Sequence, residues 1–270
     1  MTSNGFDHGK RGIGVRNHQL ILPSVVCSTH ISRRIASAVG ALSFSHQHGC
    51  GIIGADVAGI EDFFGALANH PNVSSCLIVS LGCETIQGQE LGARLASANV
   101  STKYQIIQDS GGVEATVSAG ILAARHLQES YPPVKAAFGN ITVGIDLCRE
   151  SAQIAELIAG LSEVGVETIV ARQGKSSAEN FSQLMLAKAH VILSFPSPDQ
   201  PASGFPLIPV INVASESSLH QGIIADFDLA HESTIEATIS RIMEVADAQA
   251  TIAEMNGTGE ILAPRLVRST

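Results

Sequence analysis

The residues from Ser45 to Gly51 combine side chains that often do chemistry in proteins. Within Ser45-His46-Gln47-His48-Gly49-Cys50-Gly51 there are two imidazoles, His46 and His48, and one thiol, Cys50. Histidine carries protons near neutral pH, and His and Cys are ligands that zinc and iron favour. Core packing gives no reason to gather these residue types. We therefore interpret this stretch as the centre of a functional site.

Side chains of similar kinds follow other apolar runs that are typical of strands. In chain order, the predicted strand exits carry Cys27 and His30, then His46, His48 and Cys50, then Cys83 and Glu84, and then Asp109. In a parallel sheet, ligands bind outside the carboxyl ends of the strands. We therefore expect these exits to share one rim that offers metal ligands and acid–base groups.

The rim is compatible with two kinds of metal centre. A mononuclear divalent ion with mixed nitrogen, sulfur and oxygen ligands is the first, although the spacing matches no zinc-finger pattern. An iron–sulfur cluster on Cys27, Cys50 and Cys83 is the alternative. It ranks lower because the local C-x₂-C spacing of many clusters is absent.

Two further stretches could bind an anion. The glycine-rich opening, residues 5–17, is either a flexible arm or an ordered one whose Arg16 and Asn17 reach a carboxylate or phosphate. The stretch Asp109-Ser110-Gly111-Gly112 precedes a predicted helix, where Asp or Ser would cap free N–H groups. Its alternative role is to hold a substrate carboxylate at the helix N-terminus.

The stretch Gly49-Cys50-Gly51-Ile52-Ile53-Gly54 satisfies the pattern G-x-G-x-x-G between a predicted strand and a predicted helix. A nicotinamide-dependent oxidoreductase is therefore a competing hypothesis. Against it, the match follows the second predicted strand rather than the first, and no Asp or Glu ends the next strand about 20 residues further on. We expect no nucleotide cofactor.

A repeating unit of apolar strand, polar loop and helix must position these residues. Strands are predicted at 18–26, 41–45, 73–81 and 104–108 in the first half and at 141–145, 167–171, 190–195 and 209–213 in the second. Helices are predicted to end near 39 and 131 and to span 56–69, 87–98, 152–164, 178–189 and 234–250. This alternation predicts an α/β fold, with two Rossmann-like βα-repeat halves and mostly parallel sheets.

A domain boundary is predicted near Pro132-Pro133 and the stretch 138–140, because proline ends the preceding helix. We expect an N-terminal α/β domain with His/Cys-rich site loops at residues 1–138 and a C-terminal α/β domain at residues 139–270.

Composition limits the classes of partner. The chain has 16 Lys and Arg against 25 Asp and Glu, a net charge of −9, which argues against nucleic acid or an anionic membrane surface as partner. An apolar run of ~20 residues and a signal-peptide pattern are both missing. Five scattered cysteines form no framework pattern, so the expected compartment is the reducing cytoplasm.

Several motifs occur in a fixed order along the first half. They are Gly5-Phe6, Gly9-Lys10, Gly14-Val15-Arg16-Asn17, Leu22-Pro23-Ser24-Val25-Val26-Cys27, His46-Gln47-His48-Gly49-Cys50-Gly51, His70-Pro71-Asn72-Val73, Gly82-Cys83-Glu84 and Gln108-Asp109-Ser110-Gly111-Gly112. Together they resemble the altronate/galactarate dehydratase family, to which the sulfolactate sulfo-lyase large subunit is related. A looser resemblance covers residues 209–215 and 259–264.

The chain also departs from the family. Where the family carries Glu-Cys-Gly-Gly-Ser-Asp, this chain has Gly144-Ile145-Asp146-Leu147-Cys148-Arg149-Glu150-Ser151. From the resemblance we expect this chain to be shorter than the family's catalytic portion and to lack the small N-terminal domain, which some members carry as a separate subunit. The alternative hypothesis is therefore a non-catalytic or altered-specificity homologue that binds a small hydroxy acid.

The resemblance implies dehydration of an aldonate or aldarate to a 2-keto-3-deoxy acid, assisted by a divalent metal, with iron expected before manganese or zinc. It implies metal ligation by His46, His48, Cys50 and Cys83, acid–base roles for His46, His48 and Glu84, and substrate contacts by Arg16, Asn17, Asp109, Ser110, Gly111 and Gly112. The expected partners are the sugar acid, further copies of this chain in a homo-oligomer and, as an option, a separate small subunit.

Overall fold

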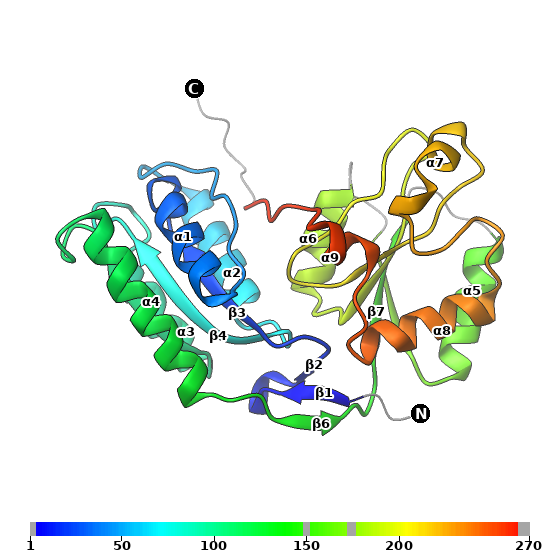
Figure 1. Cartoon of the computed structure of the whole chain (residues 1–270), viewed down its shortest axis with the longest axis horizontal. Helices are drawn as coiled ribbons and strands as arrows, with labels where there is room; N and C mark the ends of the chain where they lie inside the picture. The colour runs from blue at the N-terminus through cyan, green and yellow to red at the C-terminus, as the bar shows by residue number, and fades with distance from the viewer. Residues whose placement is uncertain (1–3, 148–151, 172–176, 264–270) are drawn as a thin grey trace. The chain divides into compact units, whose positions relative to one another are not determined.

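The computed structural model describes residues 4–147, 152–171 and 177–263 of the chain (Figure 1). The described residues divide into two compact units. The N-terminal unit comprises residues 8–12, 17–134 and 261–263, and the C-terminal unit comprises residues 4–7, 13–16 and 135–260. The main division therefore falls at 134/135, beside the predicted boundary at 138/139, and short segments from both ends of the chain join the other unit.

A parallel sheet forms the centre of the N-terminal unit. Its strands are β3 (His18–Pro23), β4 (Val73–Ser80) and β5 (Ser101–Ile106), in the order β3-β4-β5. β3 is three residues shorter than the stretch predicted for it, because residues 26–28 turn into a short 3-10 helix.

The strand predicted at 41–45 is not formed, which corrects the sequence-based expectation. Leu42 makes only an isolated parallel bridge to Leu20. The bridge consists of hydrogen bonds from Leu42 N to Gln19 O at 2.9 Å and from Ile21 N to Leu42 O at 2.8 Å. Beyond Leu42 the chain leaves the sheet edge, so the His/Cys stretch lies in a long extended loop.

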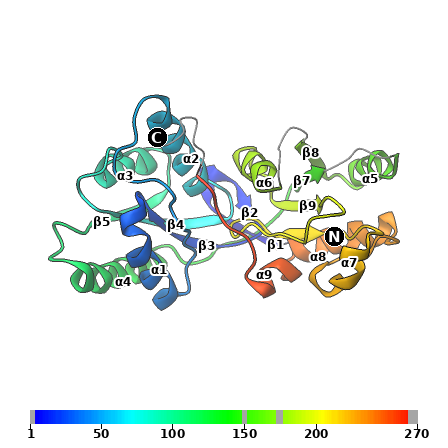
Figure 2. The ribbon, with the colours of Figure 1, turned by 90° about the horizontal axis from the view of Figure 1, so that it is seen from above.

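Helices cover both faces of this sheet. α1 (Thr29–Val39) and α4 (Val113–Ser130) pack on one face, and α2 (Ala55–Ala68) and α3 (Gly88–Ser97) pack on the other (Figure 2). On the first face, Ile21, Leu77 and Val79 pack against Ile35 of α1. Gly120 lets α4 approach Ile35 closely, since a Cβ at this position would overlap the Ile35 side chain.

A second parallel sheet forms the centre of the C-terminal unit. Its strands are β7 (Thr142–Leu147), β8 (Glu167–Ala171), β9 (Val191–Phe195) and β10 (Val210–Asn212), in the order β10-β9-β7-β8. All of them lie within two residues of their predicted bounds. Their near-continuous apolar runs are typical of parallel strands that are buried on both faces.

Helices also cover both faces of the second sheet. α5 (Ala152–Glu163) and α8 (Ile235–Ala246) share one core with β7 and β9, and α6 (Ser177–Leu186) packs on the opposite face. The short helices α7 (Ser218–Gly222) and α9 (Ile252–Asn256) complete this unit. In the described part of the chain, no helix has both the length and the apolar character needed to cross a membrane.

The glycine-rich opening contributes to a small antiparallel sheet that the sequence did not predict. Its strands are β1 (Asn4–Asp7), β2 (Ile13–Gly14) and β6 (Lys135–Ala137), in the order β2-β1-β6. The Lys135 ammonium lies 3.6 Å from the centre of the Phe6 ring, a cation–π contact that adds to the pairing of β1 with β6.

Candidate functional site

The strand exits of the N-terminal unit are joined by backbone hydrogen bonds. Val26 N donates to His48 O at 2.9 Å, which ties the loop after β3 to the His/Cys loop. Thr85 N and Thr85 Oγ1 both donate to Cys50 O at 3.1 Å, which ties the His/Cys loop to the loop after β4. Three chain segments are therefore held side by side at the carboxyl edge of the sheet, as its parallel order requires.

These segments bring together the thiols of Cys27, Cys50 and Cys83, which we call the thiol rim. Cys27 and Cys83 are exposed, and Cys50 is partly buried. Burial raises the pKa of the Cys50 thiol, and the charges and hydrogen bonds of the Cys27 and Cys83 thiols raise it further. The predicted pair Cys50 and Cys83 thus lies together, and Cys27 joins it.

Cys76 provides a contrast to the thiol rim. It lies inside β4 with no exposed surface, and burial strongly raises the pKa of its thiol. A protonated thiol in a core behaves as a small hydrophobic group. We therefore assign Cys76 a packing role.

His46 is buried, at 1% exposure, between aromatic rings. Its ring centre lies 5.3 Å from that of Phe64 and 6.4 Å from that of Phe44. Burial lowers the pKa of His46 to about 4, and the neighbouring His48 adds to this effect. His46 is therefore neutral near pH 7.

The hydrogen bonds of the two imidazoles determine where their protons lie. His46 Nδ1 accepts a hydrogen bond from His48 N at 2.9 Å, so the proton of neutral His46 lies on Nε2. His48 Nε2 lies 3.2 Å from the carbonyl oxygen of Ala263, which can only accept, so the proton of neutral His48 also lies on Nε2. Among the described residues, neither His46 Nε2 nor His48 Nδ1 has a hydrogen-bond partner, although both atoms are buried.

The two histidines consequently offer different chemistry. His48 Nδ1 presents a lone pair, which can accept a proton or bind a metal ion. His46 Nε2 presents an N–H donor, and it could bind a metal only if the hydrogen bond from His48 N were broken. The metal and acid–base roles predicted for both residues stay predictions, and the geometry favours His48.

Glu84 is buried, at 3% exposure, and both oxygen atoms of its carboxylate accept hydrogen bonds. It accepts hydrogen bonds from Ser24 Oγ at 2.7 Å, from Leu81 N at 2.9 Å and from Gly82 N at 2.6 Å. Gly82 has a φ of 118°, a conformation that favours glycine and turns its N–H toward the carboxylate. Burial acts to raise the pKa of Glu84, but these hydrogen bonds outweigh it and lower the pKa. Glu84 thus joins the loops after β3 and β4, and its predicted acid–base role stays a prediction.

A segment from the far end of the sequence covers the His/Cys loop. Ala263 N donates to Gln47 Oε1 at 3.1 Å, and Gln47 Nε2 donates to Ile261 O at 3.2 Å. Together with the Ala263–His48 bond, these contacts fix the loop. Residues 261–263 belong to the looser part of the family resemblance, and their contact with His48 was not predicted.

No described group of three or more His, Cys, Asp or Glu side chains is arranged to hold a metal ion as the structure stands. In the thiol rim, the neighbouring thiols of Cys27 and Cys83 add to the raised pKa of the Cys50 thiol. Metal ligation by His46, His48, Cys50 and Cys83 therefore stays a prediction.

Arg16 lies in the C-terminal unit and makes a bidentate ion pair. Its Nε and one terminal nitrogen each lie 2.8 Å from the Glu254 carboxylate, and it also donates to Val245 O and Gln249 O. This arrangement holds the chain after β2 against α8 and α9. Its predicted contact with a substrate carboxylate stays a prediction. Asn17, in the N-terminal unit, contacts His8 Nε2 through Oδ1 at 2.9 Å.

The stretch 109–112 forms the turn before α4. Asp109 is exposed, and Ser110 donates to Ile106 O at 2.6 Å. The cap of α4 is Gly112, at φ 99°, so the expected capping of this helix by Asp109 or Ser110 is wrong. Gly112 O accepts from Thr116 Oγ1 at 2.7 Å. Substrate contacts by Asp109, Ser110, Gly111 and Gly112 stay predictions.

The G-x-G-x-x-G match lacks the structural context of a dinucleotide site. Gly54 begins α2, but residues 41–45 form no strand in front of the match. The fingerprint needs a strand that leads directly into the glycine loop. The oxidoreductase hypothesis therefore loses the feature that suggested it.

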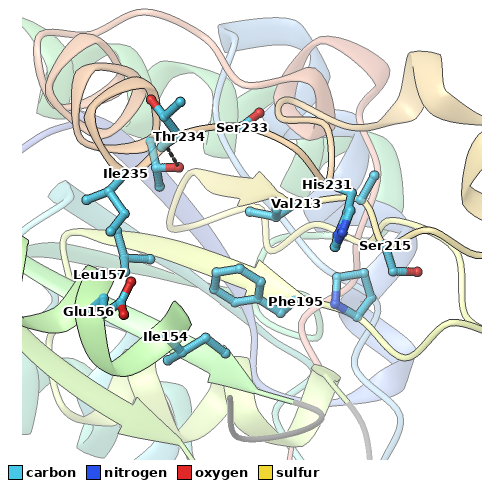
Figure 3. A pocket seen from close by; sticks show the side chains of 13 residues that line it. Ile154, Glu156, Leu157, Phe195, Val213, Ser215, His231, Ser233, Thr234 and Ile235 are labelled. Atoms are coloured by element: carbon cyan, nitrogen blue, oxygen red, sulfur yellow. Dashed lines mark hydrogen bonds between the residues drawn. The ribbon is translucent and has the colours of Figure 1, made fainter. Parts of the chain in front are cut away.

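The C-terminal unit contains a pocket of about 300 Å³ at the carboxyl edge of its sheet (Figure 3). The residues that line it are Ile154, Glu156, Leu157, Phe195, Pro196, Val213, Ala214, Ser215, His231, Ser233, Thr234, Ile235 and Thr238. They come from the end of β9, from the residues that follow β9 and β10, from the N-terminal half of α5, and from the start of α8 and the loop before it. Parallel sheets bind ligands at this edge.

The pocket combines an apolar floor with hydroxyl groups. The Phe195 ring lies at its centre, with Ser215 and His231 to one side and Thr234 to the other (Figure 3). Thr234 Oγ1 caps α8 by accepting from Ala237 N at 3.2 Å. Sequence reasoning missed this pocket, although the carboxyl-edge rule applies to the second half of the chain as well as to the first. Residues 148–151, where the chain departs from the resembled family, lie outside the described residues.

The N-terminal unit is thus an α/β domain with thiol, imidazole and carboxylate groups at the carboxyl edge of a parallel sheet. Comparison with known proteins finds a family to which part of this chain is similar. Residues 5–131 match the family described as D-galactarate dehydratase/altronate hydrolase, second domain. The chain is therefore related to the altronate/galactarate dehydratase family, and this match contains the whole thiol rim together with His46, His48 and Glu84.

Two curated relatives carry the name altronate dehydratase. The protein from Escherichia coli (strain K12) is 26% identical over 186 residues, which are 65% of this chain and 34% of that protein. The protein from Bacillus subtilis (strain 168) is 25% identical over 198 residues, which are 69% of this chain and 37% of that protein. The chain thus spans about a third of the length of these relatives. No solved structure matches it.

Proposed function

We propose that this chain acts in a hydro-lyase that removes water from a sugar acid, an aldonate or aldarate, and gives a 2-keto-3-deoxy acid with the help of a divalent metal. The observation that carries the proposal is the position of the family match. Residues 5–131 include the strand exits that the structure joins at the carboxyl edge of the N-terminal sheet. The names of the relatives support the reaction class.

The reaction removes a proton from C2 and a hydroxyl group from C3. His48 is our choice for the base, because Nδ1 carries the lone pair while Ala263 O holds the proton on Nε2. When the C2 proton moves to Nδ1, the C3 hydroxyl leaves as water with a proton from an acid. The resulting enol then gains a proton at C3 and becomes the 2-keto acid.

His46 has a supporting role in this proposal. Its Nδ1 fixes the backbone of His48, and burial lowers the pKa of His46 to about 4, so His46 is neutral near pH 7. The Nε2–H of His46 is a buried donor that can stabilise an oxygen atom of the substrate. Removal of His46 should therefore change the position of His48 as well as a contact to the substrate.

The site residues fit a divalent metal in their chemistry. The thiols of Cys50 and Cys83 are donors that iron, and alternatively manganese or zinc, can use. The lone pair of His48 serves as the base in this proposal, so it is not counted among the metal ligands. A bound ion would hold the carboxylate and the 2-hydroxyl of the substrate and stabilise the negative charge that develops on them. We keep Arg16, Asn17, Asp109, Ser110, Gly111 and Gly112 as proposed substrate contacts. The lowered pKa of Glu84 and its hydrogen bonds favour a role in holding the loops over the acid–base role predicted for it. The reducing cytoplasm remains the proposed compartment.

The test is release of 2-keto acid from a panel of aldonates and aldarates by protein purified without oxygen and supplied with Fe²⁺, Mn²⁺ or Zn²⁺. General bases contribute about 10²–10⁴-fold to rate, so His48→Gln should lower kcat by this factor. His126→Gln is the matched control, because His126 is exposed on α4. Equal rates in wild type and His48→Gln would remove His48 from the mechanism.

The panel also separates the competing hypotheses. Saturable binding of a hydroxy acid without release of keto acid, with and without a candidate small subunit, would favour the non-catalytic homologue. Reduction of NAD⁺ or NADP⁺ in the same assay would favour the oxidoreductase. Light scattering on the same sample tests the proposed homo-oligomer.

A further inference from the structure

The pocket of the C-terminal unit lies where the strand order of its sheet changes direction. From β7 the chain continues to β8 on one side, and from β9 it continues to β10 on the other side. A parallel sheet opens a crevice at such a point, outside the carboxyl ends of its strands, and ligands bind there. Leu157 on α5, which follows β7, and Phe195 at the end of β9 both line the pocket. The topology therefore marks the pocket as a ligand site of this unit.

The size and the floor of the pocket fit a small ligand with an apolar body. Its volume of about 300 Å³ is at the lower end of the range of about 300–1,000 Å³ that is typical of small-molecule sites. Phe195 is half-buried, so part of its ring stays open to a ligand at the centre of the pocket (Figure 3). Ile154, Leu157 and Val213 add aliphatic surface. The apolar body of a ligand can therefore leave water by covering the Phe195 ring.

The charges at the pocket oppose an anionic ligand. Glu156 lines the pocket with an exposed carboxylate, and no Lys or Arg is among the described residues that line it. His231 Nε2 lies 3.1 Å from Glu216 Oε1. With this partner the pair carries a charge of −1 when the imidazole is neutral and of 0 when it is protonated. The lining therefore offers a negative charge that no lining cation balances.

The N-terminus of α8 does not reverse this preference. A helix N-terminus carries a partial positive charge, which favours anions. Here Thr234 Oγ1 accepts a hydrogen bond from Ala237 N at 3.2 Å, so one of the free N–H groups already has its acceptor. Glu236 places a carboxylate in the first turn of the same helix, which offsets the helix dipole.

Two hydroxyl groups of the lining have their hydrogen atoms engaged. Thr238 Oγ1 donates to Thr234 O at 3.0 Å. His220 Nδ1 accepts from Ser215 N at 2.8 Å, so it carries a lone pair, and Ser215 Oγ donates to the same nitrogen at 2.9 Å. His220 Nε2 donates to Gln200 O at 2.7 Å, which holds the proton on that side of the ring. The oxygen atoms of Ser215 and Thr238 can therefore only accept a hydrogen bond from a ligand.

We propose that this pocket binds a small organic cation, a primary amine carried on an apolar body. An ammonium group has three donors and no acceptor, which matches a lining whose hydroxyl oxygens and Glu156 carboxylate are acceptors. A cation is also attracted to the face of an aromatic ring such as that of Phe195. The inference goes beyond the proposed function, because its ligand has the opposite charge to a sugar acid and its residues have no role in the dehydration.

The experiment compares three probes of similar shape and different charge on the full chain. They are 2-phenylethylamine as the cation, 2-phenylethanol as the neutral probe and 3-phenylpropanoate as the anion. Amide shifts in nitrogen-15 spectra give the Kd of each probe and show which residues respond. We expect shifts in residues 213–215 and 231–238, with the amine binding about tenfold more tightly than the alcohol and the carboxylate binding most weakly.

The variant that tests the charge is Glu156→Gln, with Glu163→Gln as the matched control. Glu163 is also exposed on α5, but it lies about 10 Å further along the helix at 1.5 Å per residue. Glu156→Gln should bring the Kd of the amine to that of the alcohol, whereas Glu163→Gln should bind as the wild type does. Phe195→Leu keeps an apolar floor and should weaken binding of all three probes, with circular dichroism as the check of folding.

The proposal would be overturned by any of three results. The first is that the amine causes no shifts at the pocket, the second is that the alcohol or the carboxylate binds as tightly as the amine, and the third is that Glu156→Gln leaves the Kd of the amine unchanged. Since binding is measured without metal and without sugar acid, the result does not depend on whether the chain acts in a lyase.

Discussion

The carboxyl edge of the β3-β4-β5 sheet carries thiols and imidazoles, whereas the carboxyl edge of the β10-β9-β7-β8 sheet carries a pocket with hydroxyl groups and an apolar floor. Both sheets are parallel and both have helices on each face. The two edges therefore differ in chemistry but not in architecture. Function lies in the loops that a fold presents, so fold alone could not have distinguished these two sites.

Each edge also has a buried carboxylate. Glu84 binds Ser24 Oγ and the N–H groups of Leu81 and Gly82, all from the loops after β3 and β4. Asp146, in β7, is 2% exposed and accepts from Asn180 Nδ2 at 2.6 Å and from Ser194 Oγ at 2.7 Å. Glu84 thus organises loops, whereas Asp146 joins two strands and a helix.

The largest expected effects come from removing these carboxylates. A buried donor left without its partner costs about 1–3 kcal/mol, and Glu84→Ala leaves more donors unpaired than Asp146→Ala does. We expect Glu84→Ala to lower the free energy of unfolding by about 4 kcal/mol and Asp146→Ala by about 3 kcal/mol. Hydrogen exchange resolved by peptide should show the loss of protection in β3 and β4 for Glu84→Ala and in β7 and β9 for Asp146→Ala. Equal loss in both sheets for either variant would mean that the units do not respond separately.

The next effect concerns pH. The unfolded chain protonates His46 near pH 6.5, whereas in the folded protein its pKa is about 4. Between these values the unfolded state binds more protons, so the stabilisation is complete above pH 6.5 and is lost as the pH falls toward 4. The slope is about 1.4 kcal/mol per pH unit. Urea unfolding of metal-free protein at a series of pH values measures it.

His46→Phe should flatten this slope, because the ring fits among Phe44 and Phe64 and does not titrate. The exposed His126→Gln should leave the slope unchanged. An unchanged slope in His46→Phe would assign the acid sensitivity to another group.

A smaller effect is expected from Arg16→Lys, which removes the bidentate pair with Glu254. Hydrogen bonds to charged groups contribute about 1.5–3 kcal/mol, and the loss should appear in the C-terminal unit. A rise in KM for the sugar acid of tenfold or more at unchanged stability would support the proposed contact of Arg16 with the substrate. An unchanged KM would limit the role of Arg16 to the ion pair with Glu254.

The smallest effect is expected in the pocket. Thr238→Val removes a donor to Thr234 O, but Thr238 N still donates to the same carbonyl at 3.0 Å. The expected loss is below about 1 kcal/mol, with the pocket's volume retained. Thermal unfolding measures this change in the free energy of unfolding. A larger loss would show that the Thr238 hydroxyl stabilises more than its own turn of α8.

Most strands and helices could be predicted from the sequence because their patterns are local. β8 lies at its predicted bounds and α2 within one residue of them, since each has a continuous pattern between turn residues. The strand expected at 41–45 has the same apolar character. It is not a strand because, beyond Leu42, it does not pair with a neighbouring strand. Such pairing depends on the tertiary fold and not on the local sequence.

The candidate site was predicted in part for the same reason. The carboxyl-edge rule selected the segments that carry Cys50, Cys83 and Glu84. It did not show that Glu84 would have its oxygen atoms occupied, or that Arg16 would pair with Glu254, because those partners depend on contacts between distant segments. The pairing of β1 with β6 escaped prediction because the two strands are short and lie far apart in sequence.

Residues 261–263 give the N-terminal unit a particular order of assembly during translation. The sheet β3-β4-β5 and its helices are complete once Ser130 has been synthesised, but Ala263 O, which fixes the proton of His48, emerges only after the whole C-terminal unit. A ribosome-bound chain would thus fold the β3-β4-β5 sheet and its helices first. The hydrogen bond between His48 and Ala263 would form last. A chain cut before Ile261 should keep its sheet and lose the contact with Ala263 O that defines the tautomer of His48.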